Sequence, residues 1–158
     1  MQVLSVRQPL AWAIARGHAA VENRGWATSH RGVLAIHASM RVDLESAASP
    51  LVRAAHWDPD DPVAAIGGIV AVVRLSGVCA AAVSGQECDC GAWARPAAYH
   101  WQLADPQPLP RPVAEPGGPG LWELSPALAD EVTRMLATAA VPPQPDQGPD
   151  ATRQALSA

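Results

Sequence analysis

The hydrophobic pattern of the N-terminal region predicts short strands arranged around one helix. Continuous or alternating apolar runs predict strands over residues 3–6, 20–26 and 32–38. Between the first two strands, Pro9 suits the first turn of a helix and Gly17 its C-terminal stop. The apolar stripe of this helix consists of Leu10, Ala13 and Ile14. The connection at 27–31 is short enough for a hairpin, although it lacks the Asn-Gly signature.

The middle of the chain combines an interrupted helix with the strongest strand pattern. Residues 43–56 are predicted to be helical, with Asp43 as the N-cap and Pro50 as a break or a restart. Residues 65–75 are rich in Val and Ile and predict a strand. Within it, the Gly67-Gly68 pair indicates a bulge or the close approach of another backbone segment.

The C-terminal part of the chain alternates loops with one strand and one helix. Residues 77–98 are predicted to be mostly loop, and 99–103 form a further strand before a proline-rich stretch. A helix is predicted from Ser125-Pro126, and its buried stripe is Leu128, Val132, Met135, Leu136 and Ala139. Residues 141–158 are rich in proline and are expected to be disordered.

This order of elements predicts an α+β fold in which a mixed or barrel-like sheet carries helices at its rim. We expect one domain over residues 1–140, followed by the tail over 141–158. The chain has 158 residues, of which 49% are hydrophobic and 16% charged, so it can bury a sizeable core. No apolar run is long enough to span a bilayer and no signal peptide precedes Val3, so a cytoplasmic protein without membrane contact is expected.

Charge limits the kinds of partner that the chain can bind. The net charge is −4, and all eleven basic residues are arginines, which is interpreted as codon bias as much as functional choice. Broad binding to duplex DNA requires a basic face with many phosphate contacts. Any contact with nucleic acid is therefore expected to be local and selective.

The three cysteines do not predict a metal centre by their spacing. Cys79, Cys88 and Cys90 with His100 can be considered as a metal site, but they match none of the usual paired C-x-x-C patterns. Their odd number also argues against a disulfide framework. We therefore expect reduced cysteines on a loop, no metal and no cofactor.

Arginine, amide and indole side chains gather near the N-terminus, and together they suit a planar ligand that forms hydrogen bonds, such as a nucleobase. In the second predicted strand, alternation places Glu22, Arg24 and Trp26 on one face. The predicted binding residues are Ser5, Arg7, Gln8, Trp12, Glu22, Asn23, Arg24, Trp26, Thr28 and Arg31.

Several of these residues have more than one interpretation. Glu22 and Arg24 can form a buried ion pair, recognise a ligand, or act in catalysis with Glu22 as general base. Trp12 can be a wall of a cleft or pack beneath a loop. Thr28 and Arg31 can contact a phosphate or belong to a solvated turn. His37 is interpreted as a hydrogen-bonded core histidine.

The N-terminal motifs resemble those of the ASCH domain. The resemblance rests on Ser5-x-Arg7-Gln8-Pro9-x-Ala11-Trp12, on Glu22-Asn23-Arg24-x-Trp26-x-Thr28, and on Arg31-Gly32-x-Leu34-x-Ile36-His37-Ala38. It extends through Gly67-x-Ile69-Val70, the 99–106 block and Gly120-Leu121-Trp122. The resemblance implies a PUA-like β-barrel with helices closing its openings, and an association with RNA binding.

Some members of this family have been assigned nuclease activity or hydrolysis of acylated cytidine. Members with amidohydrolase activity carry a Gly-x-Lys-x-x-Thr-x-Arg pattern, and the matching segment here runs from Gly17 to Arg24. Ala19 stands at the lysine position and Glu22 at the threonine position, so only Arg24 is retained. The amidohydrolase chemistry therefore does not transfer to this chain through the resemblance.

Three hypotheses follow. The first is a module that binds a nucleotide or a short single-stranded RNA in a cleft between the first helix and the second strand. The second is a small hydrolase acting on a modified (acylated) nucleoside or on RNA, with Glu22 as general base. In the third, the polar cluster is structural and the proline-rich tail binds a partner protein.

Overall fold

The computed structural model describes residues 1–139. The predicted disordered tail at 141–158, and the proposal that it binds a partner, lie outside the described residues. Within 1–139, no helix combines the length and the apolar character required to cross a membrane.

The described part of the chain is α+β. Its strands are β1 (Gln2–Gln8), β2 (Val21–Arg24), β3 (Gly32–Val42), β4 (Gly68–Cys79), β5 (Tyr99–Ala114) and β6 (Leu121–Glu123). Its α-helices are α1 (Leu10–Ala15), α2 (Leu44–Ala47), α3 (Pro50–Ala54) and α4 (Pro126–Ala139). Two short 3-10 helices, η1 (Pro62–Ala64) and η2 (Ala81–Ser84), flank β4.

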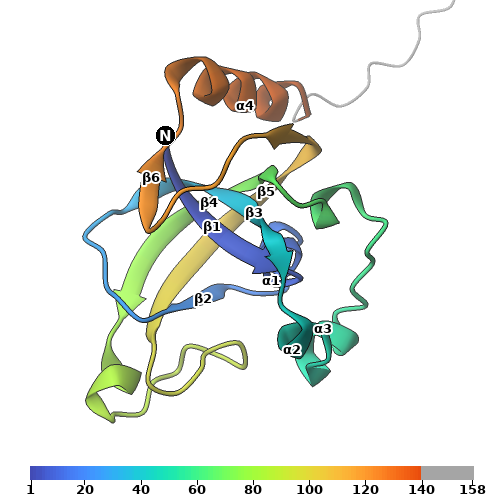
Figure 1. Ribbon diagram of the computed structural model, residues 1–158. Coiled ribbons are helices and arrows are strands. Elements are labelled where there is room, and N and C mark those ends of the chain that lie inside the picture. The colour runs from blue at the N-terminus through green and yellow to red at the C-terminus, as the bar shows by residue number, and fades with distance from the viewer. Residues whose placement is uncertain (140–158) are drawn as a thin grey trace, which may run out of the picture.

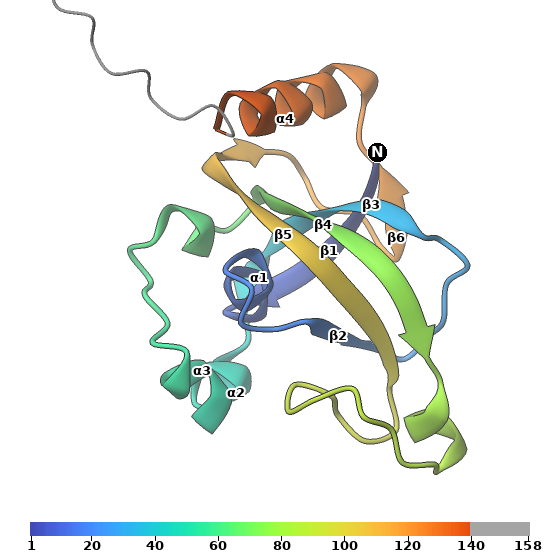
Figure 2. The ribbon, with the colours of Figure 1, turned by 180° about the vertical axis from the view of Figure 1, so that it is seen from behind.

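The strands form one mixed sheet in the order β2-β5-β4-β3-β1-β6. Only β1 and β3 are parallel, and the other neighbours run antiparallel. Figures 1 and 2 show that the sheet is strongly curved. It does not close into the predicted barrel, because β2 and β6 stand at its two ends and are not paired with each other in the described residues. The possible hairpin at 27–31 is wrong too, since β2 pairs with β5 and not with β3.

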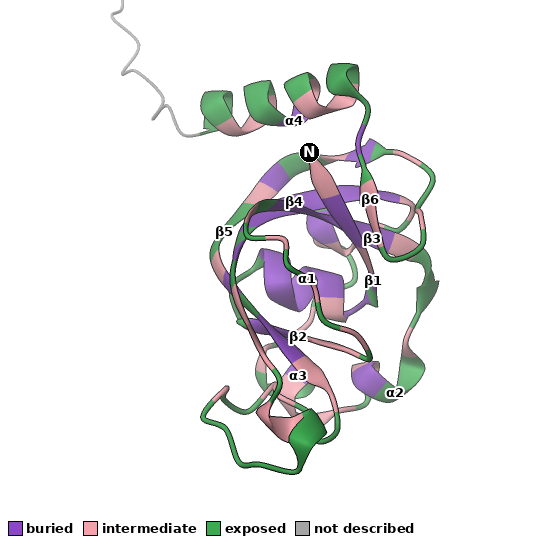
Figure 3. Cartoon of the chain, turned by 90° about the vertical axis from the view of Figure 1, so that its left-hand side faces the viewer, coloured by how far each residue is buried: buried purple, intermediate pink, exposed green. Residues whose placement is uncertain are grey.

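Alternating side chains of the sheet build two apolar layers. The concave layer includes Leu4, Leu34 and Ile36 and surrounds α1. The opposite layer includes Val3 and Ala35 and is covered by α4, whose Val132 is fully buried. Figure 3 shows α1 enclosed within the curve of the sheet and α4 outside it. Alternate side chains of β1 and β3 therefore enter one layer or the other, as expected for strands that are apolar on both faces.

Several predictions made from local sequence signals, namely a helix cap, a helix break and a glycine pair, are confirmed by the structure. Asp43 accepts a hydrogen bond from the backbone N–H of Ser46, and α3 begins afresh at Pro50, so the predicted break is confirmed. Gly67 has a φ of 75°, which favours glycine. A Cβ on Gly68 would lie 2.7 Å from the carbonyl oxygen of Val113, so the predicted close backbone approach is confirmed as well.

Strand β5 is much longer than the predicted 99–103 and runs through Pro106, Pro108, Pro110 and Pro112. Prolines are tolerated in a strand where their missing N–H would face no partner. Strand β2 pairs only with residues 99–102 of β5, so the proline-containing part has no strand partner on its outer side in the described structure. The prolines thus mark an edge and not the end of the strand.

Candidate functional site

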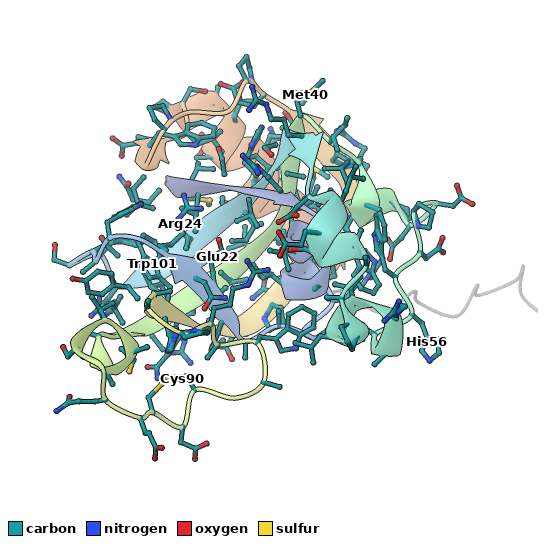
Figure 4. All side chains as sticks on the ribbon, turned by 60° about the horizontal axis from the view of Figure 1, so that its bottom comes forward. Glu22, Arg24, Met40, His56, Cys90 and Trp101 are labelled. Carbon is teal, nitrogen blue, oxygen red and sulfur yellow. The ribbon has the colours of Figure 1, made fainter. Side chains whose placement is uncertain are left out.

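A hollow of about 990 Å³ opens where β2 faces the ends of β1 and β3. The segment 117–119 and Arg95 complete its wall. Of the predicted binding residues, it is lined by Ser5, Arg7, Glu22, Asn23 and Arg24. Figure 4 shows Glu22 and Arg24 on β2, and Met40, which also lines the hollow, at the end of β3. Helix α1 contributes only Leu10 to this hollow, whereas a smaller adjoining pocket is lined by both α1 and β2, the two elements between which the cleft was predicted.

An irregularity between β1 and β3 creates part of this hollow. Val6 pairs with Ala38 and Gln8 with Val42, so two steps along β1 correspond to four along β3. The additional residues of β3 bring Ser39, Met40 and Arg41 to the hollow, and Arg7 lines it from β1. Bulges of this kind redirect side chains out of the regular alternation. Residues 39–41 were not among the predicted site residues, although two polar residues, Ser39 and Arg41, follow an apolar strand and were a usable signal.

The hollow is locally positive in a chain that is negative overall. Four arginines line it, namely Arg7, Arg24, Arg41 and Arg95, against the two carboxylates of Glu22 and Asp43. Within residues 1–139, Arg24 pairs with Glu22, whereas neither Arg7 nor Arg41 forms an ion pair. Two guanidinium groups are thus available to an anion that enters from solvent.

Glu22 is a buried carboxylate at the wall of the hollow, with only 6% of its surface exposed. Its Oε1 lies 3.3 Å from Nη1 of Arg24. Burial raises the pKa of Glu22 to about 7, although the charges of Arg24 and Arg95 act in the opposite direction. A carboxyl group that titrates near neutral pH can accept or donate a proton, which is the property of a general acid or base.

A smaller pocket of about 120 Å³ adjoins the hollow and shares Leu10, Glu22, Asn23 and Arg95 with it. Trp93 also lines this pocket. An indole therefore borders the site, but it comes from the loop before β5 and not from a predicted site residue. That loop has no periodic pattern, so sequence reasoning could not place Trp93 or Arg95 here.

The side-chain amide of Asn23 attaches this loop to β2 through two hydrogen bonds, one from its nitrogen and one to its oxygen. Its Nδ2 donates to the carbonyl oxygen of Trp93 at 2.8 Å, and its Oδ1 accepts from the backbone N–H of Arg95 at 2.8 Å. The guanidinium of Arg95 also donates to Oγ of Ser46 in α2 at 2.9 Å. Asn23 was predicted to bind ligand, but its hydrogen-bonding groups instead position two other residues of the site.

Ser5 and His37 are register partners in β1 and β3, and both form hydrogen bonds with the segment 115–118. The Ser5 hydroxyl accepts from Nε1 of Trp122 and donates to the carbonyl oxygen of Gly118, each at 3.2 Å. Nε2 of His37 donates to the carbonyl oxygen of Glu115 at 2.9 Å, in line with the predicted hydrogen-bonded core histidine. Nδ1 of His37 is buried and has no hydrogen-bond partner in the described part of the chain.

Gln8 and Trp12 do not line the hollow and serve the core. The Gln8 side chain is 1% exposed; its amide donates to the carbonyl oxygens of Val63 and Ala65 and accepts from the backbone N–H of Trp12. Trp12 is 3% exposed, and its Nε1 donates to Oδ2 of Asp61 at 2.9 Å. The curved sheet encloses α1 on several sides. The side of the helix that carries Trp12 is therefore buried, as is the side that carries Ala13 and Ile14 of the predicted apolar stripe.

Trp26 lies outside the hollow as well. Its ring packs edge-on against Trp101 with ring centroids 4.6 Å apart, and Cζ of Arg24 lies 5.8 Å from the Trp26 ring centroid. Trp26 therefore contacts the Arg24 guanidinium through a cation–π interaction and does not offer its ring to a ligand in the hollow. Thr28 and Arg31 lie in the connection to β3, where Arg31 donates to the carbonyl oxygens of Thr28 and His30, which matches the solvated-turn interpretation.

The curved mixed sheet around a buried helix has counterparts among solved structures. No protein-family model matches the chain, and no curated protein matches its sequence. A tyrosine-to-phenylalanine mutant of the ZmASCH protein from Zymomonas mobilis aligns with a TM-score of 0.52 and 16% identity, over 85% of this chain and 96% of that one. A serine-to-alanine mutant of the same protein gives 0.50 and 16%, over 84% and 94%.

These similarities define the fold. The chain is an α+β protein with an open mixed sheet, and its fold is that of an ASCH domain, as the N-terminal motifs predicted.

Proposed function

We infer that the hollow binds a single nucleotide or a short segment of unpaired RNA. The observation that carries this proposal is the pair of unpaired guanidinium groups, Arg7 and Arg41, at a hollow that also contains a buried carboxyl group. Its volume of about 990 Å³ lies at the upper end of the range for small-ligand sites. The association of ASCH domains with RNA binding supports the same class of ligand.

The two ends of the site suit the two ends of a nucleotide. Arg7 and Arg41 are suited to phosphate, because guanidinium groups form paired, charge-assisted hydrogen bonds with it. The base points toward the smaller pocket, where Glu22 offers hydrogen-bonding groups and Trp93 an aromatic surface, and Arg24 lies beside it in the hollow. Stacking of a base on an aromatic ring contributes roughly 1–3 kcal/mol. This assignment takes the stacking role from Trp12 and gives it to Trp93.

The test is a titration of the protein with nucleoside monophosphates and short oligoribonucleotides. Arg7→Ala and Arg41→Ala should each weaken binding by about tenfold to a hundredfold, since a charged hydrogen bond contributes roughly 1.5–3 kcal/mol. The matched control is Arg74→Ala on β4, which removes the same charge from an exposed pair with Asp105 of β5. Equal affinity of all three variants and the wild type would exclude the hollow as the binding site.

A second function, hydrolysis of an acylated nucleoside, is favoured by the pKa of Glu22 near 7. In this reaction the Glu22 carboxylate removes a proton from water while the water oxygen attacks the acyl carbonyl. The protonated Glu22 then returns the proton to the amine nitrogen as the C–N bond breaks, which releases a carboxylic acid and the free amino nucleoside. Arg24 lies close enough to Glu22 to stabilise the developing oxyanion.

Glu22→Gln distinguishes the two functions. If it abolishes turnover and leaves ligand affinity nearly unchanged, the protein is a hydrolase. If no turnover is found for the wild type while the arginine variants lose affinity, the binding function stands. The extent of the domain over residues 1–140, its PUA-like classification and a cytoplasmic location stay predictions from the sequence.

A further inference from the structure

Three thiols and one imidazole meet at the end of the sheet farthest from α4. Cys79 ends β4 and is the register partner of His100 in β5. Cys88 and Cys90 come from the loop that joins these two strands, and Figure 4 shows Cys90 on that loop. One ligand atom from each of the four residues lies within 4.8 Å of the ligand atoms of the others. The contact between Sγ of Cys88 and Nδ1 of His100 is 3.3 Å.

These distances fit a tetrahedral metal centre. Zinc binds cysteine sulfur at about 2.3 Å and histidine nitrogen at about 2.0–2.1 Å, which places neighbouring ligand atoms about 3.5–3.8 Å apart. Three cysteines and one histidine are an established ligand set for structural zinc. Soft thiolate ligands also favour zinc over magnesium or calcium.

The imidazole of His100 is already oriented for this role. His100 is 1% exposed, and its Nε2 lies 2.7 Å from the carbonyl oxygen of Arg95. Because a carbonyl only accepts, Nε2 carries the proton and the lone pair of Nδ1 faces the thiols. A backbone carbonyl behind the distal nitrogen is the usual way in which a metal-binding histidine is held. The side-chain amide of Gln102 similarly donates to Sγ of Cys90 at 3.8 Å.

A disulfide explains the arrangement less well. All three cysteines are free thiols in the structure. A single disulfide would use two of them and would not account for the third thiol or for the orientation of the His100 imidazole. These four residues were considered as a metal site and rejected on their spacing, because Cys79 and His100 become neighbours only through strand pairing.

We propose that Cys79, Cys88, Cys90 and His100 bind one zinc ion. Four protein ligands fill a tetrahedral coordination sphere and leave no position for substrate, so the ion is structural. It fixes the loop between β4 and β5, whose later part carries Arg95 to the hollow and Trp93 to the smaller pocket beside it. Metal binding at one end of this loop and the Asn23 hydrogen bonds at the other hold it against β2.

The direct test is the metal content of the full chain purified without a polyhistidine tag from zinc-supplemented cells. Mass spectrometry of the metal should give about one zinc per chain, and cobalt(II) substitution should give the absorption of tetrahedral thiolate coordination. Cys88→Ser and Cys90→Ser should each lower zinc affinity at least tenfold in competition with a chromophoric chelator. The matched control is Asp89→Asn, which lies between them and is exposed, and it should retain zinc.

A second measurement does not depend on the folding of any variant. Removing zinc from the wild-type protein with a chelator should speed hydrogen exchange in residues 85–98 and leave β3 unchanged. Metal-free wild-type protein with no cobalt spectrum, equal zinc content in Cys88→Ser, or an intact-mass loss showing a disulfide would each overturn the proposal. Because these readouts require no nucleotide, their outcome is independent of the proposed binding function.

Discussion

The carboxylate of Glu22 and the guanidinium of Arg24 lie 3.3 Å apart on the same face of β2, beside the hollow. The side chains are only 7% and 22% exposed, so both are largely removed from water. An opposite charge at this distance lowers the pKa of a carboxyl group, but burial has the larger effect on Glu22 and raises it to about 7. The pair thus holds a proton that an exposed glutamate would release.

Glu22 should make the stability of the protein fall as the pH rises through the range from 4.5 to about 7. Between these values the folded chain keeps a proton that the unfolded chain has lost, so the free energy of unfolding decreases and then levels off. The loss amounts to at most about 3 kcal/mol. Glu22→Gln should remove this dependence, as measured by urea unfolding at pH 5 and pH 8.

The control for this pH series is Glu45→Gln, which changes an exposed carboxylate in α2. It should follow the wild-type pH dependence. If Glu22→Gln and the wild type lose the same stability between pH 5 and pH 8, Glu22 does not carry the raised pKa.

The sequence predicted the elements whose signals are local. Pro9 and Gly17 bracket α1, and Pro50 separates α2 from α3, because proline and glycine restrict or extend the backbone wherever they occur. The polar face of β2 was also predictable, since alternation alone places Glu22 and Arg24 together.

Features that depend on the curvature and pairing of the sheet were not predictable from the sequence. Trp12 could be a cleft wall or pack beneath a loop, and the pattern of the helix alone did not decide between them. In the structure Trp12 is buried, because the sheet encloses α1. The partner of β2 is β5, which lies far along the chain, so short-range patterns did not indicate it. Trp93 and Arg95 reach the site through that pairing and through Asn23, which explains why no local pattern identified them.

Ionic strength should affect the binding of single-stranded RNA only modestly. Each phosphate contact contributes a slope of about −0.7 in a plot of log K against log salt concentration. Arg41→Ala should flatten this slope by about 0.7, and Arg74→Ala should leave it unchanged. Fluorescence anisotropy of a labelled oligoribonucleotide at several salt concentrations measures both. Identical slopes for wild type and Arg41→Ala would show that Arg41 contacts no phosphate.

Asp61 should stabilise the protein at all but acidic pH. Hydrogen bonds from Arg16 lower its pKa to about 2, against the effect of partial burial, and Trp12 and the backbone of Val63 also donate to it. The contribution is present above pH 3.8 and is lost as the pH falls toward 2. Asp61→Asn should therefore cost about 1–2 kcal/mol at pH 7 and less near pH 2.

Thermal unfolding across this pH range measures the loss caused by Asp61→Asn. The neighbouring exposed residue gives a control, Asp60→Asn, which should remain close to the wild type. Equal effects of the two substitutions would contradict a specific role of Asp61 in anchoring α1.

Gly68 should tolerate no side chain, because the backbone of β5 occupies the space. A Cβ there would lie 2.7 Å from the carbonyl oxygen of Val113, so Gly68→Ala should destabilise the fold by about 1–3 kcal/mol. Gly25 has no atom within 4 Å of the same position, and Gly25→Ala should change stability by less than about 0.5 kcal/mol. Chemical denaturation of both variants gives the comparison.

Between its pairings at Ala38 and Val42, β3 advances four residues while β1 advances two, and this irregularity determines which positions can be substituted without disturbing the core. Residues 39–41 belong to neither apolar layer, and they stand where the regular pairing of the two strands is interrupted. Substitutions at these positions can therefore reshape the rim of the hollow while the interior packing stays as it is. Under the proposed binding function, ligand preference and folding stability therefore depend on different residues of this strand.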